Sequence, residues 1–264
     1  AGPVAGQGAR ATPSMCGRYA YLPTADPTEL IEQFSIHGDP PDVTPRYNVA
    51  PTDPVTVVHT TRELQRTAAM FRWGLIPSWS KPEAARRSGH INARAETLAE
   101  KPAYRRLLQK RRCLVLASGF YEWQHGSSRR ERMPYYFSPA ADNPLTAGGY
   151  AGTGVVAFAG LYDRWYPPDG ARIDSCPILT TSPNGLVAPL HDRMPVMLAP
   201  DAIALWLDRE MADPMLLTSV LAPAAEGALT TRRVSQAVNS VANAGPECQA
   251  PAEEWNQGGI ALGP

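Results

Sequence analysis

The sequence predicts a single α+β domain on a curved or barrel-like, mainly antiparallel β-sheet core with a few peripheral helices. Short apolar runs rich in β-branched residues recur along the chain, whereas helical patterns are few. The connections between these runs hold many of the chain's 27 prolines. Strands that alternate regularly with helices are missing from this pattern, so we exclude a doubly wound parallel sheet.

The first predicted element is a helix that begins after Asp26 and continues to Phe34. Asp26 is a suitable N-cap, Pro27 suits the first helical position, and Glu29 completes a capping pattern. Strands follow over residues 55–59, 68–73, 113–117 and 120–124. A second helix is expected over residues 98–110, because its basic end suits the negative end of the helix dipole.

In the second half we expect a polar hairpin tip at residues 126–132, then strands over 155–162, 178–181 and 195–198. A short helix is expected over 201–208, and the tail after Ala244 reads as an irregular cover segment. Residues 1–14 are rich in Ala, Gly and Pro and lack the apolar core of a signal peptide. We interpret them as a disordered tag or a misassigned N-terminal extension, and residues 15–264 as one domain.

Composition excludes several classes of protein. The 264 residues carry a formal net charge of zero and are 44% hydrophobic, so no uniformly basic surface is expected. No run is long and apolar enough to span a membrane. The four cysteines form no CxxC pair, which favours a reducing, cytoplasmic compartment. Neither an HExxH motif nor a glycine-rich phosphate loop occurs, so we expect no metal and no cofactor.

Met15-Cys16 is the most informative dipeptide. Removal of everything before Cys16 leaves an α-amine and a thiol on adjacent carbons. The amine can condense with an aldehyde to a Schiff base, and the thiol can then close a five-membered thiazolidine ring. The α-amine titrates near ~7.7–8.0 and the thiol near ~8.5, so both nucleophiles are available near neutral pH. The alternative is a buried, inert cysteine that follows a methionine.

Five further segments combine polar and aromatic residues in strand or turn contexts. They are Arg46-Tyr47-Asn48-Val49-Ala50-Pro51-Thr52, Trp73-Gly74-Leu75-Ile76-Pro77-Ser78-Trp79, Ile91-Asn92-Ala93-Arg94-Ala95-Glu96-Thr97, Gly119-Phe120-Tyr121-Glu122-Trp123 and His191-Asp192-Arg193-Met194-Pro195. Asn92, Arg94 and Glu96 share one face if their segment is extended. Glu122 lies among aromatic residues, so partial desolvation should raise the pKa of its carboxyl group. Individually, each segment is also compatible with an ordinary structural role.

Together with Met-Cys-Gly-Arg, and in this order, the segments resemble the SRAP family, the SOS-response-associated peptidase-like proteins. The resemblance extends from Met15 to about residue 245. It implies an SRAP-like fold and a protein that binds single-stranded DNA and traps abasic sites as a covalent thiazolidine crosslink. An abasic deoxyribose opens to an aldehyde, the electrophile for which an N-terminal cysteine is suited.

The resemblance also implies residue roles. Cys16 is the expected nucleophile, and Asn92 holds the sugar and the cysteine. Glu122 is the expected general acid and base, and His191 assists Schiff-base formation and protonates the departing sugar oxygen. The expected DNA contacts are Arg18, Arg94 and Arg193 on phosphates, Pro51 and Trp79 as a wedge between bases, and Trp123 beside Glu122. Arginines near aromatic residues also suit single-strand binding on general grounds.

Two alternatives remain at the level of sequence. One is a thiol autopeptidase in which Cys16 removes the residues before itself. Strand cleavage through the Schiff base, which is lyase activity, belongs instead to the crosslinking hypothesis. The other is a non-enzymatic single-strand-binding module with a structural cysteine. We expect a monomer with no membrane partner, located in the cytoplasm and associated with the nucleoid when bound to DNA.

Overall fold

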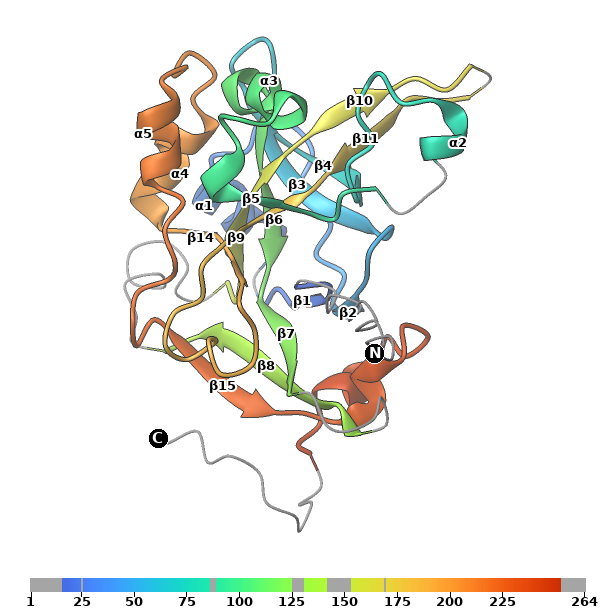
Figure 1. The fold of residues 1–264 in the computed structure, drawn as a ribbon, viewed down its shortest axis with the longest axis vertical. Coiled ribbons are helices and arrows are strands. Elements are labelled where there is room, and N and C mark those ends of the chain that lie inside the picture. Colours follow the sequence, from blue (N-terminus) through green and yellow to red (C-terminus); the bar gives the residue numbers. More distant parts are fainter. Residues whose placement is uncertain are drawn as a thin grey trace, which may run out of the picture.

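A computed structural model describes residues 16–24, 26–85, 89–124, 131–141, 153–168 and 170–252. Within these ranges the chain forms two sheets (Figure 1). The five-stranded sheet has the spatial order β15 (Leu229–Arg233), β8 (Met133–Pro139), β7 (Gly119–Gln124), β1 (Tyr19–Tyr21) and β2 (Arg46–Val49). All of its strand pairs are antiparallel.

The ten-stranded sheet curls strongly into a half-barrel. Its main path is β10 (Asp163–Trp165), β11 (Ile173–Cys176), β4 (Arg66–Trp73), β3 (Pro54–Thr60), β6 (Arg112–Ala117), β9 (Val156–Leu161), β12 (Ile178–Thr181) and β13 (Met194–Pro195). β14 (Met197–Leu198) pairs with β9, and β5 (Asn92–Arg94) pairs with β12. Only the pairs β4–β11 and β5–β12 are parallel among the described strands. The predicted fold class is therefore confirmed.

Helices are short and peripheral among the described residues. They are α1 (Pro27–Phe34), α2 (Pro82–Ala85), α3 (Pro102–Lys110), α4 (Pro200–Leu207) and α5 (Pro214–Ser219), with 3-10 turns η1 (Ala95–Thr97), η3 (Gln236–Asn239) and η4 (Pro246–Gln249). As predicted, the Asp26 carboxylate accepts a hydrogen bond from the Thr28 backbone N–H at 2.8 Å and caps α1. None of these helices is long and apolar enough to cross a membrane.

The two sheets are joined where β6 continues into β7 across Ser118 and Gly119, as the downward course of the green ribbon shows (Figure 1). A Cβ atom on Gly119 would lie 2.2 Å from the Phe137 carbonyl oxygen, so only glycine permits this close approach of β7 and β8. Between the sheets, the Tyr19 ring contacts Trp73 and Phe158 edge-on, with ring centroids 5.3 and 5.9 Å apart. These contacts belong to the main hydrophobic core.

Most predicted strands are confirmed, and two boundaries are corrected. The helix expected over 98–110 begins only at Pro102, because proline takes the first helical position and keeps Lys101 extended. The run 195–198 is divided into β13 and β14, which pair with different strands, β12 and β9. Most of the predicted hairpin tip lies outside the described residues, but β7 and β8 on either side of it pair antiparallel.

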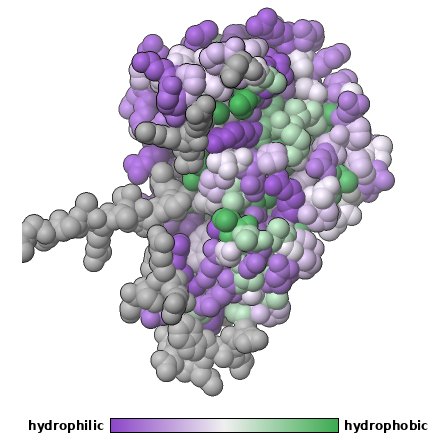
Figure 2. Space-filling view, turned by 90° about the vertical axis from the view of Figure 1, so that its right-hand side faces the viewer, coloured by the Kyte–Doolittle hydropathy of each residue, from purple (hydrophilic) through white to green (hydrophobic). Residues whose placement is uncertain are grey.

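Figure 2 shows the face at the right-hand side of Figure 1. Hydrophobic side chains occur there as separate patches among hydrophilic ones and form no continuous apolar surface. The described residues on this face therefore carry polar and apolar groups side by side.

Candidate active site

Cys16, Glu122 and His191 meet in the interior. The Cys16 sulfur, a Glu122 carboxylate oxygen and a His191 ring nitrogen all lie within 4.8 Å of one another, and all three residues are buried. Asn92 joins them, because its side-chain amide donates a hydrogen bond to the Cys16 carbonyl oxygen at 3.3 Å. The structure thus brings together the four predicted catalytic residues from segments up to 175 positions apart, counted from Cys16 to His191.

Strand pairing positions these residues. Cys16 lies three residues before the start of β1, which pairs with β7, the strand that carries Glu122. The Tyr121 backbone N–H donates to the Arg18 carbonyl oxygen at 3.0 Å and extends this pairing toward the site. Asn92 begins β5 on the neighbouring sheet. The site therefore brings together residues from both sheets.

Burial controls the protonation of the acid. Glu122 is only 2% exposed, and desolvation raises the pKa of its carboxyl group to about 8, although hydrogen bonds from the Cys16 thiol and backbone N–H act in the opposite direction. At neutral pH, Glu122 is therefore mainly a neutral carboxylic acid. One of its oxygens has no hydrogen-bond partner among the described residues, so an acceptor remains open inside the site.

The cysteine is held as a neutral thiol. Burial raises the pKa of Cys16 well above its usual value, and the neighbouring Glu122 adds to this effect. The thiol also donates to the Arg193 carbonyl oxygen at 3.5 Å. Its reactivity consequently depends on a neighbour that accepts the proton as the sulfur attacks.

His191 is oriented by the backbone that follows it. Its Nδ1 lies 3.0 Å from the Arg193 backbone N–H and 3.2 Å from the Arg193 carbonyl oxygen. The Asp192 carboxylate also lies 3.3 Å from Nδ1, but that side chain is 79% exposed. The Arg193 backbone thus contacts both the imidazole and the thiol, and it fixes the position of one relative to the other.

Cys16 has an unusual backbone conformation. Its φ angle is +25°, a value that non-glycine residues seldom adopt. Its backbone N–H is also hydrogen-bonded to Glu122. Cys16 is therefore a strained residue whose backbone nitrogen is held by a buried carboxyl group.

Arg193 is paired with a carboxylate. Its guanidinium forms a bidentate ion pair with Glu96, at 2.9 and 2.7 Å, and donates to the Thr180 carbonyl oxygen at 2.6 Å. Its side chain is only 10% exposed. The guanidinium is therefore occupied by the protein in this structure, and its contact with a DNA phosphate stays a prediction. Glu96, noted in the sequence only for sharing a face with Asn92, lies in η1 and turns away from the strand to reach this arginine.

Arg18 is also occupied by the protein. It donates to the Asn48 side-chain oxygen at 2.6 Å and to the Val238 carbonyl oxygen at 2.7 Å, which ties the η3 segment to the sheet. The Trp123 indole donates to the Asn239 side chain at 2.6 Å in the same segment. Arg18 and Trp123 thus hold the η3 segment against the five-stranded sheet, and no sequence pattern indicated Asn48 or Asn239 as their partners.

Three predicted DNA contacts remain at the surface. Arg94 is exposed at the end of β5, only two residues from Asn92. Trp79 is 75% exposed, and Pro51 is half-buried in the turn between β2 and β3. Backbone hydrogen bonds between the Pro51 turn and Trp73 are 2.8 and 2.9 Å long and hold the turn beside the end of β4, from which the Trp79 loop departs.

Cys16, Glu122 and His191 also form the one group of three potential metal ligands among the described residues. Their thiol, carboxylate and imidazole are all ligand types that zinc accepts. The sequence predicts no metal because the three residues share no local spacing motif. The same set also suits nucleophilic catalysis, in which a thiol requires an adjacent acid and base.

The sheet architecture and the buried thiol, carboxyl and imidazole groups describe a curved-sheet protein with a cysteine, glutamate and histidine cluster in its interior. A family model described as SOS response associated peptidase (SRAP) matches residues 15–241. The chain belongs to the SRAP family, as the sequence motifs predict.

Relatives agree with this family, and a solved structure shares the fold. The Abasic site processing protein YoqW of Bacillus subtilis (strain 168) is 38% identical over 237 residues, which cover 88% of this chain and 98% of that protein. The Abasic site processing protein HMCES of Rattus norvegicus is 30% identical over 272 residues, which cover 90% of this chain and 76% of that protein. A crystal structure from Bacteroides thetaiotaomicron is similar with a TM-score of 0.72 at 24% identity, covering 89% of this chain and all of the other. That similarity supports the fold alone.

Proposed function

We propose that this protein processes abasic sites by binding single-stranded DNA and trapping the lesion covalently through Cys16. The observation that carries the proposal is the meeting of the Cys16 sulfur with the Glu122 carboxyl group and the His191 ring within 4.8 Å. Two relatives are named abasic site processing proteins, which agrees with an abasic site as the substrate. The chemistry requires a free α-amine on Cys16, so any residues before it must first be removed.

The first step forms an imine. The ring-opened abasic deoxyribose carries an aldehyde, and the Cys16 amine attacks its carbon. The resulting carbinolamine loses water, so one C–N double bond replaces the C=O bond. Protonated Glu122 and His191 are the groups near enough to deliver the proton that the departing oxygen needs.

The second step closes the ring. The Cys16 sulfur adds to the imine carbon, one C–S bond forms, and the thiol proton is transferred to the nitrogen. Nothing is oxidised or reduced. The hydrogen bond between the thiol and Glu122 supports transfer through that carboxyl group. Asn92, bonded to the Cys16 carbonyl oxygen, limits rotation of the nucleophile.

DNA contact would come from the exposed groups beside the site. Arg94 has a free surface position for a phosphate, and the exposed Trp79 ring offers a plane on which a base can stack. Pro51 lies in the adjacent turn and would complete a wedge. A local arginine contact of this kind is compatible with the zero net charge of the chain.

A specific observation also favours autopeptidase activity as a preceding step. The nitrogen of the peptide bond before Cys16 is hydrogen-bonded to Glu122, and Cys16 is strained. Attack of the sulfur on the Met15 carbonyl carbon would form a thioester while the C–N bond breaks and Glu122 protonates the nitrogen. Water would then hydrolyse the thioester, releasing the preceding residues and freeing both the amine and the thiol.

The test compares two forms of the protein with an abasic single-stranded oligonucleotide on a denaturing gel, with intact mass to verify each N-terminus. Protein that begins at Cys16 should form a heat-stable adduct. Protein that retains residues 1–15 should form one only after it has cleaved itself. Cys16→Ser keeps the amine, so its imine should hydrolyse or proceed to strand cleavage, which is lyase activity.

Cys248→Ser is the matched thiol control, because Cys248 is buried outside the site and should be dispensable for the adduct. A stable adduct on protein whose N-terminal extension is intact would rule out the thiazolidine. Loss of the preceding residues without any adduct would leave only the autopeptidase, and no mass change at all would favour a non-enzymatic binding module.

A further inference from the structure

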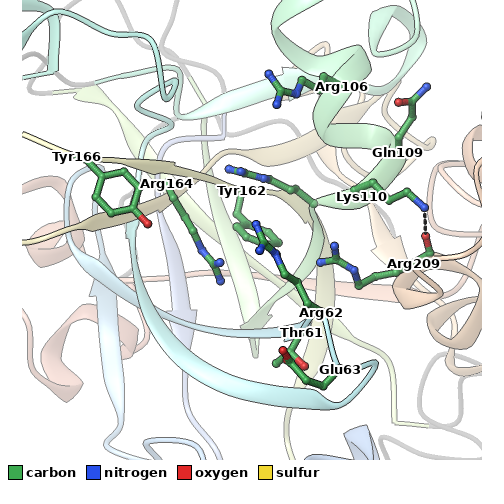
Figure 3. A pocket seen from close by; sticks show the side chains of 11 residues that line it. Thr61, Arg62, Glu63, Arg106, Gln109, Lys110, Tyr162, Arg164, Tyr166 and Arg209 are labelled. Carbon is green, nitrogen blue, oxygen red and sulfur yellow. Dashed lines mark hydrogen bonds between the residues drawn. The ribbon is translucent and has the colours of Figure 1, made fainter.

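A pocket that does not include the cysteine is lined largely by arginine. It has a volume of about 630 Å³, within the range of ~300–1,000 Å³ typical of small-molecule sites. Its cationic side chains are Arg62, Arg106, Lys110, Arg111, Arg164 and Arg209. They come from the turn after β3, the end of α3, strand β10 and the segment after α4 (Figure 3).

The lining of this pocket carries a large excess of positive charge. Glu63 is the one carboxylate in its lining. Arg111 is paired with Asp163, and Arg164 lies 3.6 Å from Asp174. Four cationic side chains of the lining remain outside the ion pairs found among the described residues. On a chain whose net charge is zero, this gathering of like charges costs folding free energy unless an anion offsets it.

Three of these cations, Lys110, Arg164 and Arg209, are also held in place. The Lys110 ammonium donates to the Arg209 carbonyl oxygen at 2.9 Å, and Arg209 donates to the Thr60 carbonyl oxygen at 3.3 Å. The Arg164 guanidinium lies over the Tyr162 ring at 5.6 Å. Figure 3 shows Arg62, Arg164 and Arg209 directed toward the middle of the pocket. Arginines fixed in this way match the geometry of phosphate oxygens with little loss of side-chain entropy.

Neutralisation of the α3 dipole does not account for the cluster. Arg112, which lies outside the pocket lining, already donates to the Leu108 and Gln109 carbonyl oxygens at the end of that helix. The pocket also contains an aromatic ring at its rim, because Tyr166 is 67% exposed and lines it. A cationic interior with an exposed ring beside it favours an anion that also carries a planar group.

The pocket lies far from the cysteine site. Strand β6 begins beside Arg111 in the pocket and continues through β7 to Glu122. Its six residues alone span roughly 20 Å at ~3.3 Å per residue. The lining encloses the pocket from several directions in Figure 3, which suits a compact ligand better than a continuous strand.

We propose that this pocket binds a free nucleoside diphosphate or triphosphate, with the phosphate chain among Arg62, Arg164 and Arg209 and the base against Tyr166. The inference goes beyond the proposed function and does not depend on it. Several charge-assisted contacts to one phosphate chain supply the affinity, and the ring adds the preference for a nucleotide over pyrophosphate.

The experiment is calorimetric titration of the full chain with ATP, ADP, pyrophosphate and adenosine. ATP and ADP should bind with one-to-one stoichiometry, pyrophosphate more weakly, and adenosine without detectable heat. Arg62→Glu should weaken ADP binding at least about tenfold, because an exposed cation becomes a repelling anion. Arg105→Glu is the matched control, since Arg105 is exposed on α3 outside the lining, and it should retain affinity.

The outcomes separate the possible ligands. Absence of saturable nucleotide binding overturns the proposal, as does an equal loss in the Arg62 and Arg105 variants. Displacement of ADP by an undamaged single-stranded oligonucleotide, lost with Arg62→Glu, assigns the pocket to a DNA strand and also overturns it. Abasic-site crosslinking by the Arg62 variant should match the wild type, so failure of the active-site proposal would be recognised independently.

Discussion

Glu122→Gln should make the protein more stable at neutral pH. In the unfolded chain this carboxyl group releases its proton near pH 4.5, whereas in the folded protein it retains the proton up to about pH 8. Between these values the folded state binds one more proton than the unfolded state, so stability falls as the pH rises. At ~1.4 kcal/mol per pH unit, the loss at pH 7 is about 3 kcal/mol.

Glutamine has nearly the same shape and no charge, so it should remove this loss. For a domain of this size the melting temperature at pH 7 should rise by roughly 6–12 °C. At pH 4.5 the variant and the wild type should melt close together, because the buried acid is still neutral. The measurement is thermal unfolding followed by circular dichroism from pH 4.5 to 8.5.

Glu32→Gln serves as the control, because Glu32 is exposed in the middle of α1 and should give no pH-dependent difference. The reasoning is refuted if Glu122→Gln changes the melting temperature by the same amount at every pH. It is equally refuted if the variant melts below the wild type at pH 7. A confirmed gain together with lost crosslinking would identify Glu122 as a group retained for chemistry at the expense of stability.

Four further outcomes are expected. Arg94→Ala should weaken binding to single strands of any sequence and reduce the slope of log affinity against log salt by about 0.7, whereas Arg105→Ala should do neither; an unchanged slope removes the phosphate role. Glu96→Ala should destabilise the fold by about 1–2 kcal/mol in chemical denaturation, because the Arg193 guanidinium loses its bidentate partner. It should also slow crosslinking, because the backbone carbonyl of Arg193 contacts the Cys16 thiol. His191→Gln should slow adduct formation at least about a hundredfold in a gel time course, and a wild-type rate would exclude acid–base assistance by this ring. A chelator should leave the crosslinking rate unchanged, and inhibition that added zinc reverses would show that the three-residue cluster works with a metal.

Local signals made part of the structure predictable. The Asp26 cap and Pro27 locate α1, and Ser118-Gly119 separates β6 from β7, because each depends on neighbours in the sequence. The short strands β1 and β2 were missed. They contain only three and four residues, and partners far along the chain stabilise them.

The candidate site shows the same division. The motifs identified the four residues of the cluster, because Cys16, Asn92, Glu122 and His191 each stand in a separate motif of the sequence. They did not reveal that Arg193 turns inward to Glu96 or that Arg18 binds the η3 segment. Those contacts join positions 97 and 220 residues apart, and no periodicity of the sequence encodes such a distance. The arginine pocket was missed for the same reason, because separate segments build it.

The assembly of the site from distant segments has a consequence during synthesis. Cys16 leaves the ribosome long before Asn92, Glu122 and His191, and the sulfur contacts the Arg193 backbone across 177 positions of the chain. A nascent chain that ends before Glu122 therefore has a cysteine without its acid, its imidazole or the carbonyl that holds its thiol. The order of translation therefore delays assembly of the proposed site until nearly the whole domain has been made and folded.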